Sequence, residues 1–150
     1  MADRAKDSEF LYVTYIRTTP QALWSALTDP ATIRAFWFGM TVECDFAAGS
    51  PWRLKFEDGR VADEGEVLEA DPPRRLALRW RNAWNPEFAS EGDTRCTFEL
   101  EAVDSAVKLT VHHCSDQPDS RLITAVSGGW PKILCNLKTL LETDSALFAG

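Results

Sequence analysis

The two histidines of the chain, His112 and His113, are adjacent and are followed by Cys114. Histidine exchanges protons near neutral pH, so this triplet is the first candidate for acid–base or nucleophilic chemistry. The two histidines end the alternating segment "VKLTVHH", in which His113 shares the parity of the apolar residues. His113 is therefore predicted to face the interior, either as a general base or ligand contact, or as a histidine satisfied by a nearby backbone or carboxylate group. Because neighbouring strand side chains point to opposite faces, His113 and Cys114 cannot meet within a regular strand.

Motifs for other chemistries are absent from the sequence. There is no G-x-S-x-G nucleophile motif, and the glycines in "GSP" and "SGG" lack the spacing of a phosphate-binding loop. Cys44, Cys96, Cys114 and Cys135 stand apart, without the C-x-x-C spacing of structural zinc sites, although Cys114 with a neighbouring histidine is a weak alternative. We therefore expect no metal, no cofactor and no catalytic residue, and the sequence favours binding over enzymatic activity.

The carboxylates in "RVADEGEVLEAD" are harder to place. Strict alternation would turn Asp63 inward, where a buried carboxylate needs a partner such as Arg79 or Arg81. Gly65 is a candidate for a bulge that resets the register. We expect that Asp63 and Glu66 instead lie on the outer face or at the rim of the sheet.

The elements that must position these residues follow from periodicity. "FLYVTYIRT" predicts a strand, and Thr19-Pro20 and Asp29-Pro30 each predict the start of a short helix. From residue 41 onward the period is two, as in "WRLKFE", "RLALRWR" and "CTFELE", with turn signals such as "EDGR" between the segments. The prediction is an α+β fold: one strand, two short helices, about six further antiparallel strands and a long C-terminal helix over residues 119–143.

The C-terminal helix carries three residues that disfavour helix. Its apolar residues recur at offsets of three, four and seven, yet Gly128, Gly129 and Pro131 lie within the pattern. Gly129 falls on the inner stripe, which removes a side chain where the helix faces the sheet, while Pro131 falls on the outer flank. We expect one bent helix, thinned where it passes a cavity; the alternative is a fresh helix that starts at "GGWP".

Composition limits the classes of partner. The chain has 150 residues and a formal net charge of −7, which argues against nucleic acid as a partner. No secretory signal and no apolar run of membrane-spanning length occur, so we expect a cytoplasmic protein without membrane insertion. The length predicts a single domain over residues 1–150, with residues 1–8 disordered.

The order and spacing of "AFWFG", "FAAGSPWRLKFEDG", "GEVLEADPPRRLALRW" and "GGWPKILCNLKTLLE" resemble the START-like (SRPBCC) superfamily. Within it, the chain is most similar to the AHSA-type branch, named for the C-terminal domain of the activator of heat-shock-protein ATPase. The resemblance implies a helix-grip (START/Bet v-like) fold, in which a curved sheet of about six to seven strands wraps around the last helix. It also implies a cavity between sheet and helix that can hold an apolar small molecule or lipid.

The residues expected to line that cavity are mostly aromatic or aliphatic, with His113 as the polar group that sets specificity. They are Trp52, Phe56, Leu78, Trp80, Phe98, Val111, His113, Gly129, Trp130, Ile133 and Leu134. The alternative is that the six tryptophans of the chain fill the cavity as ordinary core.

Three functions remain open at this point. The first is binding of a hydrophobic or aromatic small molecule. The second is a co-chaperone-like interaction with a heat-shock ATPase, although the co-chaperone carries a further N-terminal region for which this chain has no room. The third is a cyclase or hydrolase acting on a hydrophobic substrate, which requires polar groups that converge inside the cavity.

Overall fold

The computed structural model describes residues 8–148. The predicted disordered N-terminus lies outside these residues, except for Ser8, which begins the first strand. The elements are β1 (Ser8–Ile16), α1 (Pro20–Thr28), α2 (Pro30–Phe36), β2 (Thr41–Cys44), β3 (Pro51–Lys55), β4 (Val61–Asp71), β5 (Arg75–Asn82), α3 (Pro86–Ala89), β6 (Thr94–Val103), β7 (Ala106–Ser115) and α4 (Arg121–Thr143). The predicted order of elements is confirmed.

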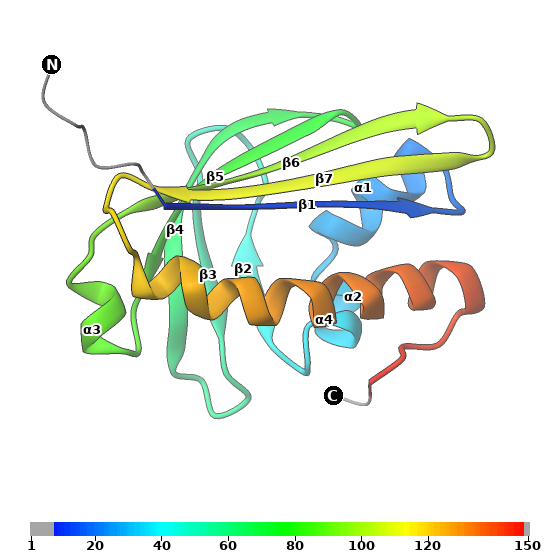
Figure 1. Ribbon diagram of the computed structural model, residues 1–150. Helices are drawn as coiled ribbons and strands as arrows, with labels where there is room; N and C mark the ends of the chain where they lie inside the picture. The colour runs from blue at the N-terminus through cyan, green and yellow to red at the C-terminus, as the bar shows by residue number, and fades with distance from the viewer. Residues whose placement is uncertain (1–7, 149–150) are drawn as a thin grey trace, which may run out of the picture.

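The seven strands form one antiparallel sheet in the order β1-β7-β6-β5-β4-β3-β2. The chain crosses the sheet once, because β1 pairs with β7 while the other neighbours are consecutive. Figure 1 shows α4 running along β1 and β7, while the strands β2, β3 and β4 bend down behind the helix. The sheet therefore curves around α4, and one of its faces is enclosed.

Proline after a capping residue starts each short helix. Thr19, Asp29 and Asn85 accept a backbone N–H of the following turn through their side chains, and each precedes a proline at the first helical position. The sequence predicted only the two short helices α1 and α2. The helix α3 was missed although Asn85-Pro86 carries the same signal.

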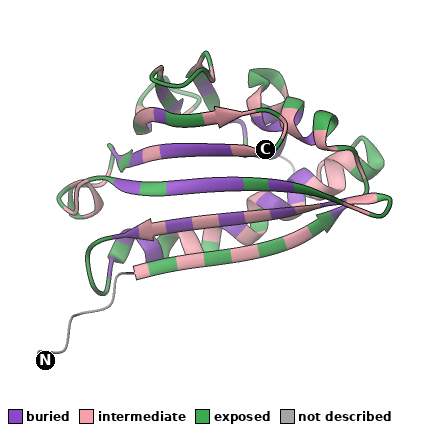
Figure 2. Cartoon of the chain, turned by 90° about the horizontal axis from the view of Figure 1, so that it is seen from above, coloured by how far each residue is buried: buried purple, intermediate pink, exposed green. Residues whose placement is uncertain are grey.

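Alternating residues bury one face of the sheet and leave the other in contact with solvent. In β7, Val107, Val111 and His113 on the inner parity are fully buried. On the outer parity of the edge strand β1, Leu11 and Tyr15 are at least half exposed. Figure 2 shows this alternation of buried and exposed residues along the strands. The burial pattern confirms the period-two interpretation.

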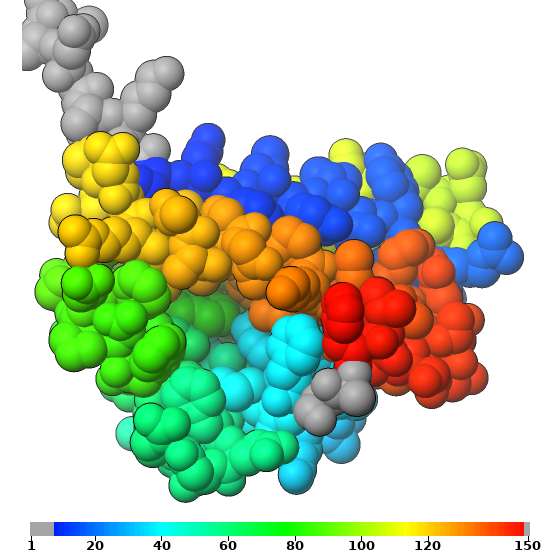
Figure 3. Space-filling model, turned by 60° about the horizontal axis from the view of Figure 1, so that its bottom comes forward, coloured from blue at the N-terminus to red at the C-terminus, as the bar shows by residue number. Residues whose placement is uncertain are grey.

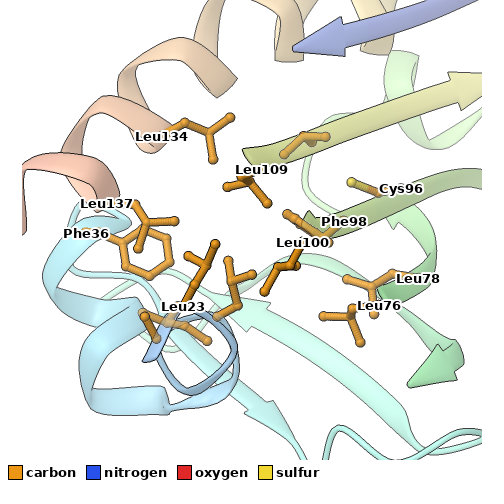
Figure 4. Close-up of a cluster of buried hydrophobic side chains, with 14 of the residues drawn as sticks. Leu23, Phe36, Leu76, Leu78, Cys96, Phe98, Leu100, Leu109, Leu134 and Leu137 are labelled. Carbon is orange, nitrogen blue, oxygen red and sulfur yellow. The ribbon is translucent and has the colours of Figure 1, made fainter. Parts of the chain in front are cut away.

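The inner face of the sheet packs against α4 on one side and against α1 and α2 at one end. Figure 4 shows Leu23 and Phe36 from the short helices and Leu134 and Leu137 from α4 meeting side chains of the sheet. All four of these side chains are nearly inaccessible to solvent. Burial of this apolar surface is the main stabilising contribution to the fold.

The helix α4 is continuous, so the alternative of a fresh helix at "GGWP" is wrong. Ser120 caps its N-terminus by accepting the N–H of Ile123, and Asp144 ends it in the left-handed conformation. Pro131 lies inside the helix, and a Cβ added at Gly129 would meet no atom within 4 Å beyond the adjoining backbone of its own helix and its chain neighbours. Gly129 therefore borders open space.

Gly65 is required where β4 passes between two tryptophans. It pairs with Trp52 on β3 and with Trp80 on β5, and a Cβ placed on it would lie 1.7 Å from the carbonyl oxygen of Arg79. The indole N–H of Trp52 donates to that same oxygen at 2.8 Å. The bulge that we expected at Gly65 instead lies between Val67 and Glu69, so the glycine serves close packing and not a register shift.

Replacement of Gly65 by alanine is expected to destabilise the protein by about 3 kcal/mol, because the new methyl group displaces Arg79 and disrupts its bond with Trp52. Urea unfolding followed by tryptophan fluorescence measures the change. Gly128→Ala is the matched control. Unlike the Cβ added at Gly65, the Cβ added at this helical position meets open space, so the free energy of unfolding should rise by up to about 1 kcal/mol. An unfolding midpoint for Gly65→Ala equal to that of the wild type would contradict the steric argument.

Candidate functional site

A pocket of about 210 Å³ opens between β4, β5, the α3 connection and α4. Its walls are largely aromatic, and two polar side chains reach it. The lining residues are Trp37, Asp63, Trp80, Asn82, Trp84, Phe88, Leu122, Ala125, Val126, Gly129, Trp130 and Ile133. In Figure 3 the surface is hollowed between the green segment that contains α3 and the orange helix α4. We refer to this site as the aromatic pocket.

A second, much smaller space lies further under the sheet. It is a void of about 30 Å³ between α1, α2 and the strands β2, β3, β5 and β6, lined by side chains such as Trp52, Leu78 and Phe98. Trp80 borders both spaces, and its ring packs against Trp52 at a centroid distance of 4.6 Å. Trp80 therefore separates the open aromatic pocket from the small void.

His113 is enclosed by the core and bonded through both ring nitrogens. The indole N–H of Trp130 donates to Nδ1 at 3.2 Å, so this nitrogen carries no proton. The other nitrogen, Nε2, then donates to the hydroxyl of Thr94 at 2.8 Å, and that hydroxyl donates to the carbonyl of Trp80 at 3.0 Å. Burial lowers the pKa of His113 to about 3, with a further contribution from His112. At neutral pH His113 is an uncharged structural bridge between strands and helix.

Asp63 is half-buried and lines the aromatic pocket, so of the two positions expected for it, the outer face or the rim of the sheet, the outer face is wrong. Its Oδ1 accepts the indole N–H of Trp80 at 3.0 Å and the amide of Asn82 at 3.2 Å. Arginine is not its partner, because Arg79 pairs with Asp93. Burial raises the pKa of Asp63 to about 6, and the two donated hydrogen bonds oppose this rise.

Asn82 also holds the outer wall of the pocket in place. Its side-chain oxygen accepts the backbone N–H of Asn85, which in turn caps α3. Between these residues Trp84 is half exposed, and its ring meets Phe56 edge-on at a centroid distance of 6.0 Å. The network that starts at Asp63 therefore fixes the segment that forms the pocket mouth.

The structure separates the residues predicted to line one cavity into three groups. Trp80, Gly129, Trp130 and Ile133 line the aromatic pocket. Trp52, Leu78 and Phe98 line the small void, together with Trp80. The remaining four line neither space: Val111, His113 and Leu134 are buried in the core, and Phe56 supports Trp84 from outside.

Several lining residues were missed by sequence reasoning. Leu122 and Val126 precede Gly129 and Ile133 on the helical stripe, so the spacing of four and seven could have found them. Phe88 lies in the short helix α3, for which the Asn-Pro signal was not used. Asn82 had no signal in the sequence, because its role depends on the contact with Asp63 across the strands.

Most of the chain matches a known protein family. Residues 17–142 match the family described as activator of Hsp90 ATPase homolog 1-like protein. The chain belongs to this family. Membership supports a role in ligand binding or in assisting a chaperone, as the START-like resemblance implied. A comparison with curated proteins finds no match.

Solved structures of similar proteins share the helix-grip fold. A protein from Mesorhizobium loti is 26% identical with a TM-score of 0.79, over 90% of this chain and 97% of that chain. An Hsp90 activator from Plasmodium falciparum is 22% identical with a TM-score of 0.73, over 89% of this chain and 96% of that chain. CalU16 from Micromonospora echinospora is 20% identical with a TM-score of 0.74, over 92% of this chain and 78% of that chain. The last two identities establish a common fold and no more.

Residues 8–148 also lack two features that would point to other functions. Within this range no cluster of three or more histidine, cysteine, aspartate or glutamate side chains is arranged to hold a metal ion. None of the helices in the same range is long and apolar enough to cross a membrane.

Replacement of Asp63 by asparagine keeps the acceptor for Trp80 and Asn82 but removes the charge. The folded-state pKa of Asp63 lies above the usual value, so ionisation costs stability as the pH rises from about 4 to 6. Asp63→Asn should therefore exceed the wild type in unfolding free energy by about 1–3 kcal/mol at pH 7.5 and match it at pH 4. Urea titrations at both pH values test this, and His113 contributes equally to both proteins. A gap that is constant with pH would contradict the buried ionisation.

Proposed function

We propose that the protein binds a small, largely apolar molecule in the aromatic pocket. The observation that carries this proposal is an open pocket walled by four tryptophans and a phenylalanine, next to a helix position where Gly129 leaves space. Aromatic walls with few polar groups are typical of small-molecule sites. Family membership supports the same role.

The size of the pocket restricts the ligand. A volume of about 210 Å³ is below the range of about 300–1,000 Å³ that is common for drug-sized ligands. The pocket therefore suits a molecule with one or two rings, or an alkyl group of similar bulk. A sterol or a phospholipid chain is too large to be enclosed in a pocket of this volume.

The lining residues support binding over catalysis. Within the described part of the chain, the pocket wall includes no histidine, cysteine, serine or lysine. Asp63 and Asn82 are the polar groups that converge there, and both are already bonded to neighbouring side chains. A nucleophile paired with a base, which hydrolysis or acyl transfer by a protein nucleophile needs, is not present in this wall.

Replacement of Gly129 by leucine is expected to block the pocket without loss of stability. The added side chain enters open space, and leucine favours helix over glycine by up to about 1 kcal/mol. With 2-naphthol as the probe, isothermal titration calorimetry should show affinity reduced at least tenfold, while the urea midpoint stays equal or rises.

Gly128→Leu is the matched control. Gly128 is the neighbouring glycine, it is exposed, and it does not line the pocket, so the variant gains the same helix preference and should keep its affinity for 2-naphthol. If Gly129→Leu binds the probe as well as the wild type does, the ligand site is not in this pocket.

The second candidate is assistance to an Hsp90-type chaperone, which the family match favours. A surface on which a partner could dock is the outer face of β1, where Leu11, Val13 and Tyr15 are exposed side by side on one parity. Addition of the protein to Hsp90 should then raise the rate of ATP hydrolysis. Leu11→Lys with Tyr15→Lys should abolish that stimulation and leave 2-naphthol binding intact. Absence of any stimulation by the wild type would remove this candidate.

A further inference from the structure

The two carboxylate oxygens of Asp63 have different surroundings. Oδ1 accepts from Trp80 and Asn82, whereas no hydrogen bond or ion pair joins Oδ2 to any described residue. Among the described residues, every side-chain nitrogen or oxygen that is shut off from solvent has a hydrogen-bond partner. Because Oδ2 has no such partner, it is not shut off from solvent. Asp63 lines the aromatic pocket, so a group bound in that space lies next to this carboxylate.

The charge of Asp63 is not balanced by the protein. Across the strands it faces Leu54 on β3 and Asn82 on β5. The pocket residues of α4 and of the α3 segment carry no charge, and neither does Trp37. On β5, Arg79 pairs with Asp93 and Arg81 is exposed. Asp63 is thus the one ionisable group among the pocket residues that the structure describes.

The other walls suit a cation as well. Trp37, Trp80 and Trp130 pack against one another, at ring centroid distances of 5.3 to 6.0 Å, and all three residues line the pocket. Trp84 adds a fourth indole at the mouth. Indole faces attract ammonium groups, more strongly where water is excluded, and the net charge of −7 favours the approach of cations.

We propose that the ligand of the aromatic pocket is an amine that is cationic at neutral pH, with its ammonium group against Asp63 and its apolar body against the tryptophan wall. This inference rests on the proposed function and specifies the ligand class. An ammonium group supplies the missing counter-ion, while an anionic ligand would meet Asp63 without any positive partner. The raised pKa of Asp63 agrees with this arrangement, since burial without a counter-ion disfavours the ionised form.

Three probes of one shape separate the charge from the ring. They are 2-(aminomethyl)naphthalene, which is a cation at pH 7.5, 2-naphthalenemethanol, which is neutral, and 2-naphthoate, which is an anion. Calorimetry at pH 7.5 should give the ammonium probe at least tenfold higher affinity than the alcohol, and no measurable affinity for the carboxylate. At pH 5.5 the ammonium probe should bind about fourfold more weakly, because a group with pKa about 6 is then mostly protonated.

Asp63→Asn tests the residue directly. In this variant the ammonium probe and the alcohol should bind with equal affinity, and the dependence on pH should vanish. If the variant does not fold, the affinities of the wild-type protein for the three probes at pH 7.5 and for the ammonium probe at pH 5.5 still test whether the ligand is a cation. Equal affinities for the ammonium probe and the alcohol in the wild type would overturn the cationic ligand and leave small-molecule binding intact. Failure of all three probes, together with 2-naphthol, would overturn the proposed function itself.

Discussion

The packing of the interior depends on how the indole ring and the N–H of Trp130 are accommodated where α4 covers the sheet. A large aromatic ring is needed to fill the space under a curved sheet, but an indole brings an N–H that must be bonded when it is buried. His113 accepts that N–H, and its other nitrogen passes the bond on to Thr94 and to the backbone of Trp80. One chain of hydrogen bonds thereby joins α4 to β7, β6 and β5. The position of the helix relative to the sheet is set by polar contacts as well as by apolar packing.

The contact between the rings of Trp80 and Trp130 divides the interior into two parts. On one side of Trp80 and Trp130, side chains from α1, α2 and the sheet close the space to about 30 Å³. On the other side α4 presents Gly129, the wall is completed by the α3 segment, and about 210 Å³ stay open. Trp80 serves both halves, since its ring packs the core and its N–H holds Asp63 at the edge of the pocket. The aromatic pocket and the core therefore share residues, and a change at Trp80 would affect both.

Features that depend on period and local capping could be predicted from the sequence. The alternation in β7 placed His113 inside, and the apolar spacing placed Gly129 on the inner stripe of α4. Features that depend on contacts between distant residues could not. Asp63 is tolerated inside because Trp80 and Asn82 donate to it, and neither neighbour is the arginine that charge pairing suggested. The inward side of His113 was predicted, but whether its nitrogens face a ligand or the core depends on Trp130, which lies 17 residues away.

The open space beside Gly129 has an evolutionary consequence. A glycine codon becomes an alanine or a valine codon through a single base change, and either substitution at this position narrows the pocket while the helix keeps its place against the sheet. Gly65 has no such freedom, because any Cβ there collides with the backbone of β5. Substitution at Gly129 can thus change the volume of the pocket, whereas Gly65 preserves the architecture. The fold can therefore be kept while the shape of its pocket changes.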